Sequence, residues 1–243
     1  MITVKEIAEK TMSESKKASA KNDIFAFYVG RPLSYVLTIP FLYTNIKPNT
    51  ITLLSIIPTA VGFTLSCFVD TKLGMIFCWL MYFLWNLLDG VDGNVARYKK
   101  QFSQLGSVYD AMSGYLAAAL TFFSTAIMAA HSDGILQSND ILNTDALIIK
   151  GGLSALFNMF PRLVMHKAIT EMGSKEDVAE VSDKKNYSIV KIIALNLKSA
   201  AGGAQVLMLV AICLGITDIY SVCYFLFNIL VMLTSLKTIL KEK

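Results

Sequence analysis

Long apolar stretches separated by short polar breaks run through most of this chain. A helix needs about 20 such residues to cross the hydrocarbon core of a bilayer. Six stretches approach or exceed this length, at residues 51–69, 73–88, 110–130, 146–165, 189–216 and 219–236. Backbone in lipid must satisfy its own hydrogen bonds, and a helix does so within one segment. The pattern therefore predicts an all-α integral membrane protein with six transmembrane helices.

The part of the chain before the first apolar stretch has a different pattern. Residues 1–22 are polar and predict a surface helix, whereas residues 24–46 are apolar but interrupted by Arg31-Pro32 and by Pro40. Such an interrupted segment is a poor membrane span, and we interpret it as an N-terminal interfacial helix lying on the bilayer surface. The chain is accordingly expected to divide into an interfacial N-terminal segment at 1–47 and a six-helix transmembrane domain at 48–243.

The composition supports a membrane protein. Hydrophobic residues make up 54% of the chain and charged residues only 16%, which is more apolar than soluble domains usually are. The formal net charge is +4, which indicates some affinity for anionic lipid headgroups and no nucleic-acid partner.

Basic residues lie mainly on one side of the predicted membrane. They occur in the N-terminal segment, in the turn at 97–100, in the polar loop at 167–191 and in the tail at 237–243, whereas the opposite loops at 131–145 and 217–220 contain no Lys or Arg. Basic loops stay in the cytoplasm. Both termini and the turn at 97–100 are therefore predicted to be cytoplasmic.

Three carboxylates lie at the cytoplasmic ends of two consecutive predicted helices. Asp89 and Asp92 are three residues apart and share a helix face, and Asp110 at the start of the next helix can face them. Ionisable groups at this depth are rare and usually functional. Ligation by oxygen alone suits Mg²⁺ or Mn²⁺ bridging a diphosphate better than zinc.

The residues that follow Asp92 suit a phosphate ligand. Gly93 lets a bulky group approach the backbone, and the small Ala96 keeps the same wall low. Arg97 supplies a forked donor that matches phosphate oxygens.

This constellation resembles the signature of the CDP-alcohol phosphotransferase (CDP-alcohol phosphatidyltransferase) family, D-x2-D-G-x2-A-R-x8-G-x3-D-x3-D. Seven of its eight defined places are filled, by Asp89, Asp92, Gly93, Ala96, Arg97, Gly106 and Asp110. Upstream, the run Pro48-Asn49-Thr50-Ile51-Thr52 is similar to the P-N-x-x-T entry to the family's first transmembrane helix. The resemblance covers about residues 48–130, whereas the last three helices match only in hydropathy and number.

The resemblance implies a reaction and a set of roles. Members of the family cleave a CDP-linked lipid or alcohol donor, transfer its phosphoryl-alcohol group to an acceptor and release CMP. Asp89, Asp92 and Asp110 would ligate Mg²⁺ or Mn²⁺. Donor-contacting residues would be Asn49, Thr52, Asp89, Gly93, Ala96, Arg97, Ser103 and Gly106. The resemblance also implies a homodimer among membrane lipids, in a bacterial cell membrane and with its active site facing the cytoplasm.

The eighth place departs from the family pattern. There the family has an aspartate that ligates a second metal and accepts the acceptor's proton, and this chain has Gly114. A general base typically contributes about 10²–10⁴-fold to a rate. The catalytic candidates are therefore Asp110, Ser113 and Gly114.

Three interpretations of Gly114 are open. Another group can replace the base, such as Ser113, Tyr109, Tyr115 or a metal-bound water. Alternatively, the acceptor attacks through an oxygen that is already ionised, as in a phosphate or carboxylate, and the glycine leaves room for it. In the third interpretation the chain binds CDP-lipid or nucleotide without efficient turnover.

Further basic residues are candidates for binding an anionic acceptor. Arg31, Arg162 and Lys198 lie in or beside apolar segments and either line a pocket open to the cytoplasm or extend to the interface. Small and polar residues at 196–205 predict helix packing or a further site.

Overall fold

The computed structural model describes residues 2–12, 17, 20–132, 134–172 and 189–240. Helices account for most of this part, which contains no strand. In chain order they are α1 (Val4–Thr11), the π-helix η1 (Ala26–Gly30), α3 (Arg31–Leu42), α4 (Pro48–Ser66), α5 (Lys72–Lys99), α6 (Gly106–Ala130), α7 (Ile135–Ser138), α8 (Thr144–Met172), α10 (Ile189–Lys198), α11 (Gly203–Leu214) and α12 (Thr217–Ile239). The expected all-α membrane class is confirmed, since the described residues include five helices long and apolar enough to cross a bilayer.

The fifth predicted span, at 189–216, is not one straight helix. It is divided into α10 and α11, whose axes differ by 62°, so six spans result only if this bent pair counts as one. The break contains Gly202 and Gly203, both poor helix formers. In addition, the Asn196 amide connects α10 to the N-terminal segment: Nδ2 donates to Asn22 O at 2.6 Å and to Ile192 O of its own helix at 2.9 Å, and Oδ1 accepts from Ile24 N at 2.9 Å. Hydropathy predicted the membrane segment correctly and its continuity wrongly.

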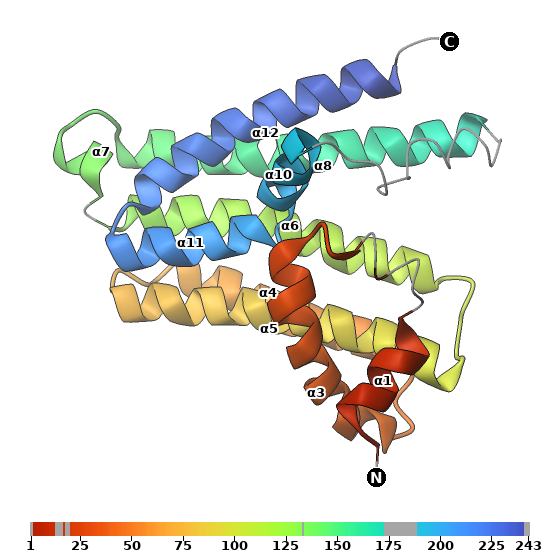
Figure 1. Ribbon diagram of the computed structural model, residues 1–243. Coiled ribbons are helices and arrows are strands. Elements are labelled where there is room, and N and C mark those ends of the chain that lie inside the picture. The colour runs from red at the N-terminus through yellow and green to blue at the C-terminus, as the bar shows by residue number, and fades with distance from the viewer. Residues whose placement is uncertain (1, 13–16, 18–19, 133, 173–188, 241–243) are drawn as a thin grey trace.

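The N-terminal segment is helical from residue 26 to residue 42, despite Arg31-Pro32 and Pro40. Pro32 lies just after the π-helix η1, where the regular hydrogen-bond pattern of an α-helix is already changed, and Pro40 lies in the last turn of α3. In Figure 1 α3 crosses the end of α5, at the lower right of the view. The basic loop expected at 167–191 falls mostly outside the described residues.

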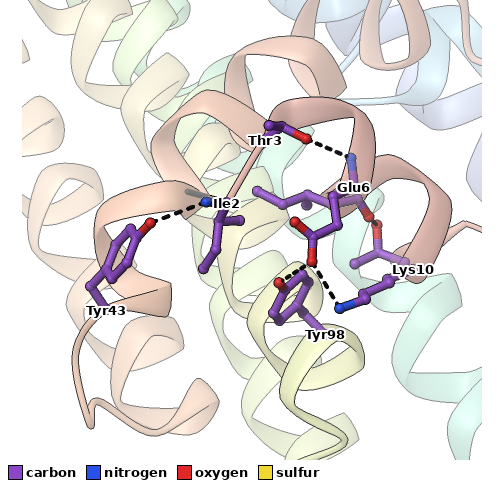
Figure 2. A network of polar contacts seen from close by, with 8 residues as sticks. Ile2, Thr3, Glu6, Lys10, Tyr43 and Tyr98 are labelled. Carbon is purple, nitrogen blue, oxygen red and sulfur yellow. Dashed lines mark hydrogen bonds and ion pairs between the residues drawn. The ribbon is translucent and has the colours of Figure 1, made fainter.

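The short helix α1 is fixed to the C-terminal end of α5. Tyr98 Oη donates to Glu6 Oε1 at 2.6 Å, and Lys10 Nζ lies 2.9 Å from the same oxygen and 4.4 Å from the centre of the Tyr98 ring. Figure 2 shows this network, together with Ile2 N donating to the Tyr43 hydroxyl. The hydrogen bonds from Tyr98 and Lys10 lower the pKa of the Glu6 carboxyl below its ordinary value of 4.5. Docking of α1 is therefore favoured at neutral pH and weakens as Glu6 is protonated.

We expect Ile7→Ala to release α1 from α5. Ile7 is fully buried among Tyr35, Val91 and Val95, and a buried isoleucine truncated to alanine typically costs about 2–5 kcal/mol. Hydrogen exchange in detergent micelles should show loss of protection at the amides of α1 while α5 stays protected. Val4→Ala, on the exposed side of the same helix, is the matched control, and equal protection in both variants would contradict the docking.

Polar contacts hold α4, α5 and α6 together beside the acidic residues. Trp85 Nε1 of α5 donates to Ser113 Oγ of α6 at 2.9 Å, and this oxygen lies 2.9 Å from Ser55 Oγ of α4. Inside a bilayer, such hydrogen bonds and close packing replace the hydrophobic drive between helices. They fix the relative positions of the three helices that carry the candidate site.

Candidate active site

A first cavity of about 320 Å³ opens where the start of α4, the end of α5 and the start of α6 meet. Every residue expected to contact a nucleotide donor lines it, with the exception of Asp89. Its lining consists of Pro48, Asn49, Thr52, Asp92, Gly93, Ala96, Arg97, Gln101, Phe102, Ser103, Gly106, Ser107 and Asp110. Residues as far apart in sequence as Pro48 and Asp110 thus line one hollow.

Hydrogen bonds between helices shape this cavity. Asn49 Nδ2 of α4 donates to Ser103 Oγ at 3.0 Å, across the turn between α5 and α6. Deeper in, Thr52 Oγ1 donates to Asp92 Oδ2 at 2.5 Å, and Asp92 is only 7% exposed. Within the P-N-x-x-T segment, Thr52 therefore contacts the acidic motif, and Asn49 contacts the turn between α5 and α6.

A second cavity of about 300 Å³ contains the three predicted carboxylates. Asp89, Asp92 and Asp110 all line it, together with Arg31 and Arg97. It shares Asp92, Gly93, Arg97 and Asp110 with the first cavity, so the two hollows meet at these residues. The acidic residues thus lie beside the cavity that the nucleotide-contacting candidates form.

The donor set fits a hard divalent cation, because it consists of carboxylate oxygens from two helices around one hollow. Among the described residues, no three His, Cys, Asp or Glu side chains form a group that could hold a metal ion in their present positions. The metal ligands Asp89, Asp92 and Asp110 therefore remain a prediction.

Arg97 occupies the space that Gly93 leaves free. A side-chain Cβ at Gly93 would lie 3.0 Å from Arg97 Nη2 and 3.1 Å from Nη1, so the guanidinium folds back over the glycine one turn earlier in the same helix. Its Nη2 donates to Asn94 Oδ1 at 3.2 Å. Among the described residues, the buried Nε of Arg97 has no hydrogen-bond partner. Gly93 thus leaves room for the Arg97 guanidinium, and it also lines both cavities.

The two residues considered at the place of the missing base differ in their surroundings. Ser113 is 1% exposed, its hydroxyl contacts Trp85 and Ser55, and it lines none of the three cavities described. Gly114 lies one helical turn after Asp110, and a Cβ there would meet no atom within 4 Å. The place of the family's aspartate is therefore open space, and Ser113 does not reach it from its present position.

A third cavity, of about 520 Å³, is lined by Tyr115, which follows Gly114 in α6. Arg162 of α8 lies 5.7 Å from the centre of the Tyr115 ring, and the His166 ring lies 5.8 Å from it. The complete lining is Asp23, Tyr115, Pro161, Arg162, Met165, His166, Leu195, Lys198, Ser199, Ser235 and Ile239. Arg162 and Lys198 thus line one cavity, which is the first of the two alternatives considered for them, and Arg31 lines the second cavity.

One residue of the site was missed in the sequence. Asn94 is 3% exposed and contacts Arg97, although it occupies an undefined place of the motif. The sequence did indicate this contact, because Asn94 is three residues before Arg97 and residues three apart in a helix are neighbours.

Comparison with protein families gives one match. Residues 45–148 match the family model described as CDP-alcohol phosphatidyltransferase. This segment contains α4, α5 and α6 and therefore every residue that lines the first cavity. Comparison with curated proteins gives no match.

Proposed function

We propose that this chain, whose residues 45–148 match the CDP-alcohol phosphatidyltransferase family, transfers a phosphoryl-alcohol group from a CDP-linked donor to an acceptor and releases CMP. The family match supports the general class, a transferase that uses a CDP-alcohol. The observation that carries the finer proposal is that Asp92, which accepts a hydrogen bond from Thr52, and Arg97 line both of the adjoining cavities.

The donor is placed with its nucleotide in the first cavity and its diphosphate beside Arg97. The guanidinium is held over Gly93 and lines both cavities, so its N–H groups can donate to a phosphate oxygen there. Asn49 and Ser103 offer amide and hydroxyl groups at the opposite wall of the same cavity.

Asp89, Asp92 and Asp110 are proposed to hold the divalent cation that the family uses. When bound, Mg²⁺ or Mn²⁺ would neutralise the diphosphate and the charge that develops on the departing CMP. Thr52 orients Asp92 by donating to one of its oxygens and leaves the other oxygen available.

The acceptor is proposed to enter from the third cavity and to carry an anionic group. Arg162, Lys198 and His166 supply positive charge or hydrogen-bond donors there, and Gly114 leaves open space one residue from Tyr115. In the transfer, the acceptor oxygen bonds to the phosphorus of the phosphoryl-alcohol group, and the bridging phosphorus–oxygen bond breaks with its electron pair leaving on CMP. An attacking oxygen that is already ionised carries no proton to remove, which accounts for a site with glycine at the place of the base.

The alternative is a family member that binds CDP-lipid without efficient turnover. Gly114 favours it, because a missing base costs about 10²–10⁴-fold where the acceptor is a neutral hydroxyl. The buried hydroxyl of Ser113 offers no replacement from its present position.

The test is CMP release from the purified, detergent-solubilised protein. Donors should include CDP-diacylglycerol and a CDP-linked polar alcohol, each with neutral and phosphorylated acceptors, with Mg²⁺ or Mn²⁺ and with a chelator. We expect metal-dependent CMP release that is largest with an anionic acceptor. Tight metal-dependent CDP binding without CMP over hours would favour the alternative, and neither binding nor release would end the proposal.

Three further features remain predictions. They are the homodimer, the location in a bacterial membrane and the cytoplasmic orientation of the site. The start of α4 and the end of α12 lie at the same end of the bundle (Figure 1). This follows because the chain crosses the bundle in alternating directions through α4, α5, α6, α8, the α10–α11 pair and α12.

A further inference from the structure

Asn94 lies between α3 and Arg97 and contacts both. Its Nδ2 donates to Ser34 Oγ at 3.3 Å and to Thr38 Oγ1 at 3.1 Å, so each amide hydrogen has its own acceptor on α3. Its Oδ1 accepts from Arg97 Nη2 at 3.2 Å. The side chain is 3% exposed and lines the second cavity, so it forms a buried connection between two helices beside the site.

The hydroxyls on α3 fix the direction of this amide. Ser34 Oγ donates its hydrogen to Arg31 O at 2.9 Å, and Thr38 Oγ1 donates to Ser34 O at 2.6 Å. The oxygens of both hydroxyls can therefore only accept a hydrogen bond from Asn94, and only the NH₂ group of its amide can donate one. A flipped amide would also point its N–H groups at the guanidinium, placing donor against donor. The amide oxygen is thus directed at Arg97.

Close packing of α3 on α5 makes this geometry stiff. At Gly90, one turn before Asn94, a Cβ would lie only 2.8 Å from Ser34 Cβ, so the two helices approach more closely than a side chain at this position allows. On its other side the guanidinium lies against Gly93, where a Cβ would be 3.0 Å from Arg97 Nη2. Arg97 is therefore confined by Gly93 beneath it and by Asn94 at Nη2.

We propose that Asn94 is a positioning residue through which α3, by Ser34 and Thr38, sets the Arg97 guanidinium for the donor diphosphate. The inference rests on the proposed function, because it requires that Arg97 binds the donor. An arginine side chain loses rotamer entropy when a ligand fixes it, and holding it in the binding orientation before the ligand arrives removes part of this cost of binding. The N-terminal helix α3 then belongs to the donor site, although none of its residues is in the family motif.

The experiment compares Asn94→Ala and Thr38→Val with Thr125→Val. Thr125 is a fully buried hydroxyl that donates to its own helix carbonyl, as Thr38 does, but lies in α6 away from the cavities. We expect the donor KM and the Kd of CDP in the presence of Mg²⁺ to rise about tenfold in Asn94→Ala, the scale of one lost hydrogen bond to a charged group. Thr38→Val should shift both constants in the same direction by less, and Thr125→Val should leave both unchanged.

A double-mutant cycle separates positioning from general loss of packing. Asn94→Ala should have no further effect on CDP binding in an Arg97→Lys background, because Asn94 is proposed to act only by positioning the Arg97 guanidinium. Equal weakening in both backgrounds, or a KM and Kd unchanged in Asn94→Ala while the melting temperature falls, would overturn the inference and show a structural role. If the unmodified protein neither binds CDP nor releases CMP, the proposed function itself has failed. If it binds CDP and Asn94→Ala binds equally well, only the positioning role has failed.

Discussion

Replacing Asp92 by asparagine is expected to lower CMP release about 10³-fold, because a metal ligand supplies several kcal/mol of charge stabilisation in the transition state. Asp92 lines both the first and the second cavity and is the most buried of the three carboxylates. Asparagine keeps the size of the side chain and still accepts the hydrogen bond from Thr52 Oγ1, so the contact between α4 and α5 is preserved. The loss should therefore be of charge and not of fold.

The measurement is CMP release at saturating Mg²⁺, together with the Mg²⁺ concentration that gives half-maximal activity. Asp140→Asn is the matched control, because Asp140 is exposed beside α7, at the other end of α6 from the site, and its positive φ of 56° suits asparagine. An Asp92→Asn protein that released CMP at nearly the unmodified rate would show that this carboxylate does not act on the diphosphate.

The fold class could be predicted from the sequence because lipid imposes a simple requirement. Each apolar stretch of about 20 residues had to be a helix, and five such helices are found among the described residues. The bend between α10 and α11 was not predictable in the same way. A hydropathy window measures composition, whereas the break depends on Asn196 bonding to residues 22 and 24, about 170 positions earlier.

The site was predictable as a set of residues and less so as an arrangement. Spacing on one helix placed Asp89 and Asp92 on a common face, and the structure brings Asp110 to the same cavity. The spacing of residues in the sequence could not show that Arg97 would fill the space over Gly93, or that Ser113 would turn toward Trp85. Those directions depend on how α3, α4 and α6 pack around α5, and packing between helices leaves no periodic signal in one sequence.

Gly114→Asp should convert the site to one that uses neutral alcohols. The new side chain would enter space where no atom lies within 4 Å of its Cβ, one turn from Asp110, so it requires no rearrangement of neighbours. A carboxylate there can accept the proton of an acceptor hydroxyl, and general bases contribute about 10²–10⁴-fold. Transfer to a neutral alcohol such as glycerol should rise by this order. Transfer to an anionic acceptor should fall, because the added negative charge repels it.

Gly114→Asn separates basicity from bulk, since its side chain has nearly the same shape and no charge. It should reduce transfer to the anionic acceptor if the glycine is needed for space, and it should not stimulate transfer to glycerol. Both variants replace a glycine inside α6 and should fold at least as well as the unmodified chain, because glycine costs about 1 kcal/mol relative to alanine in a helix interior. If Gly114→Asp folds, binds CDP and still transfers to neither acceptor class faster than before, the proton is not the obstacle. The chain would then be a nucleotide-lipid binding protein, because the carboxylate that the family uses as its base would be present without effect.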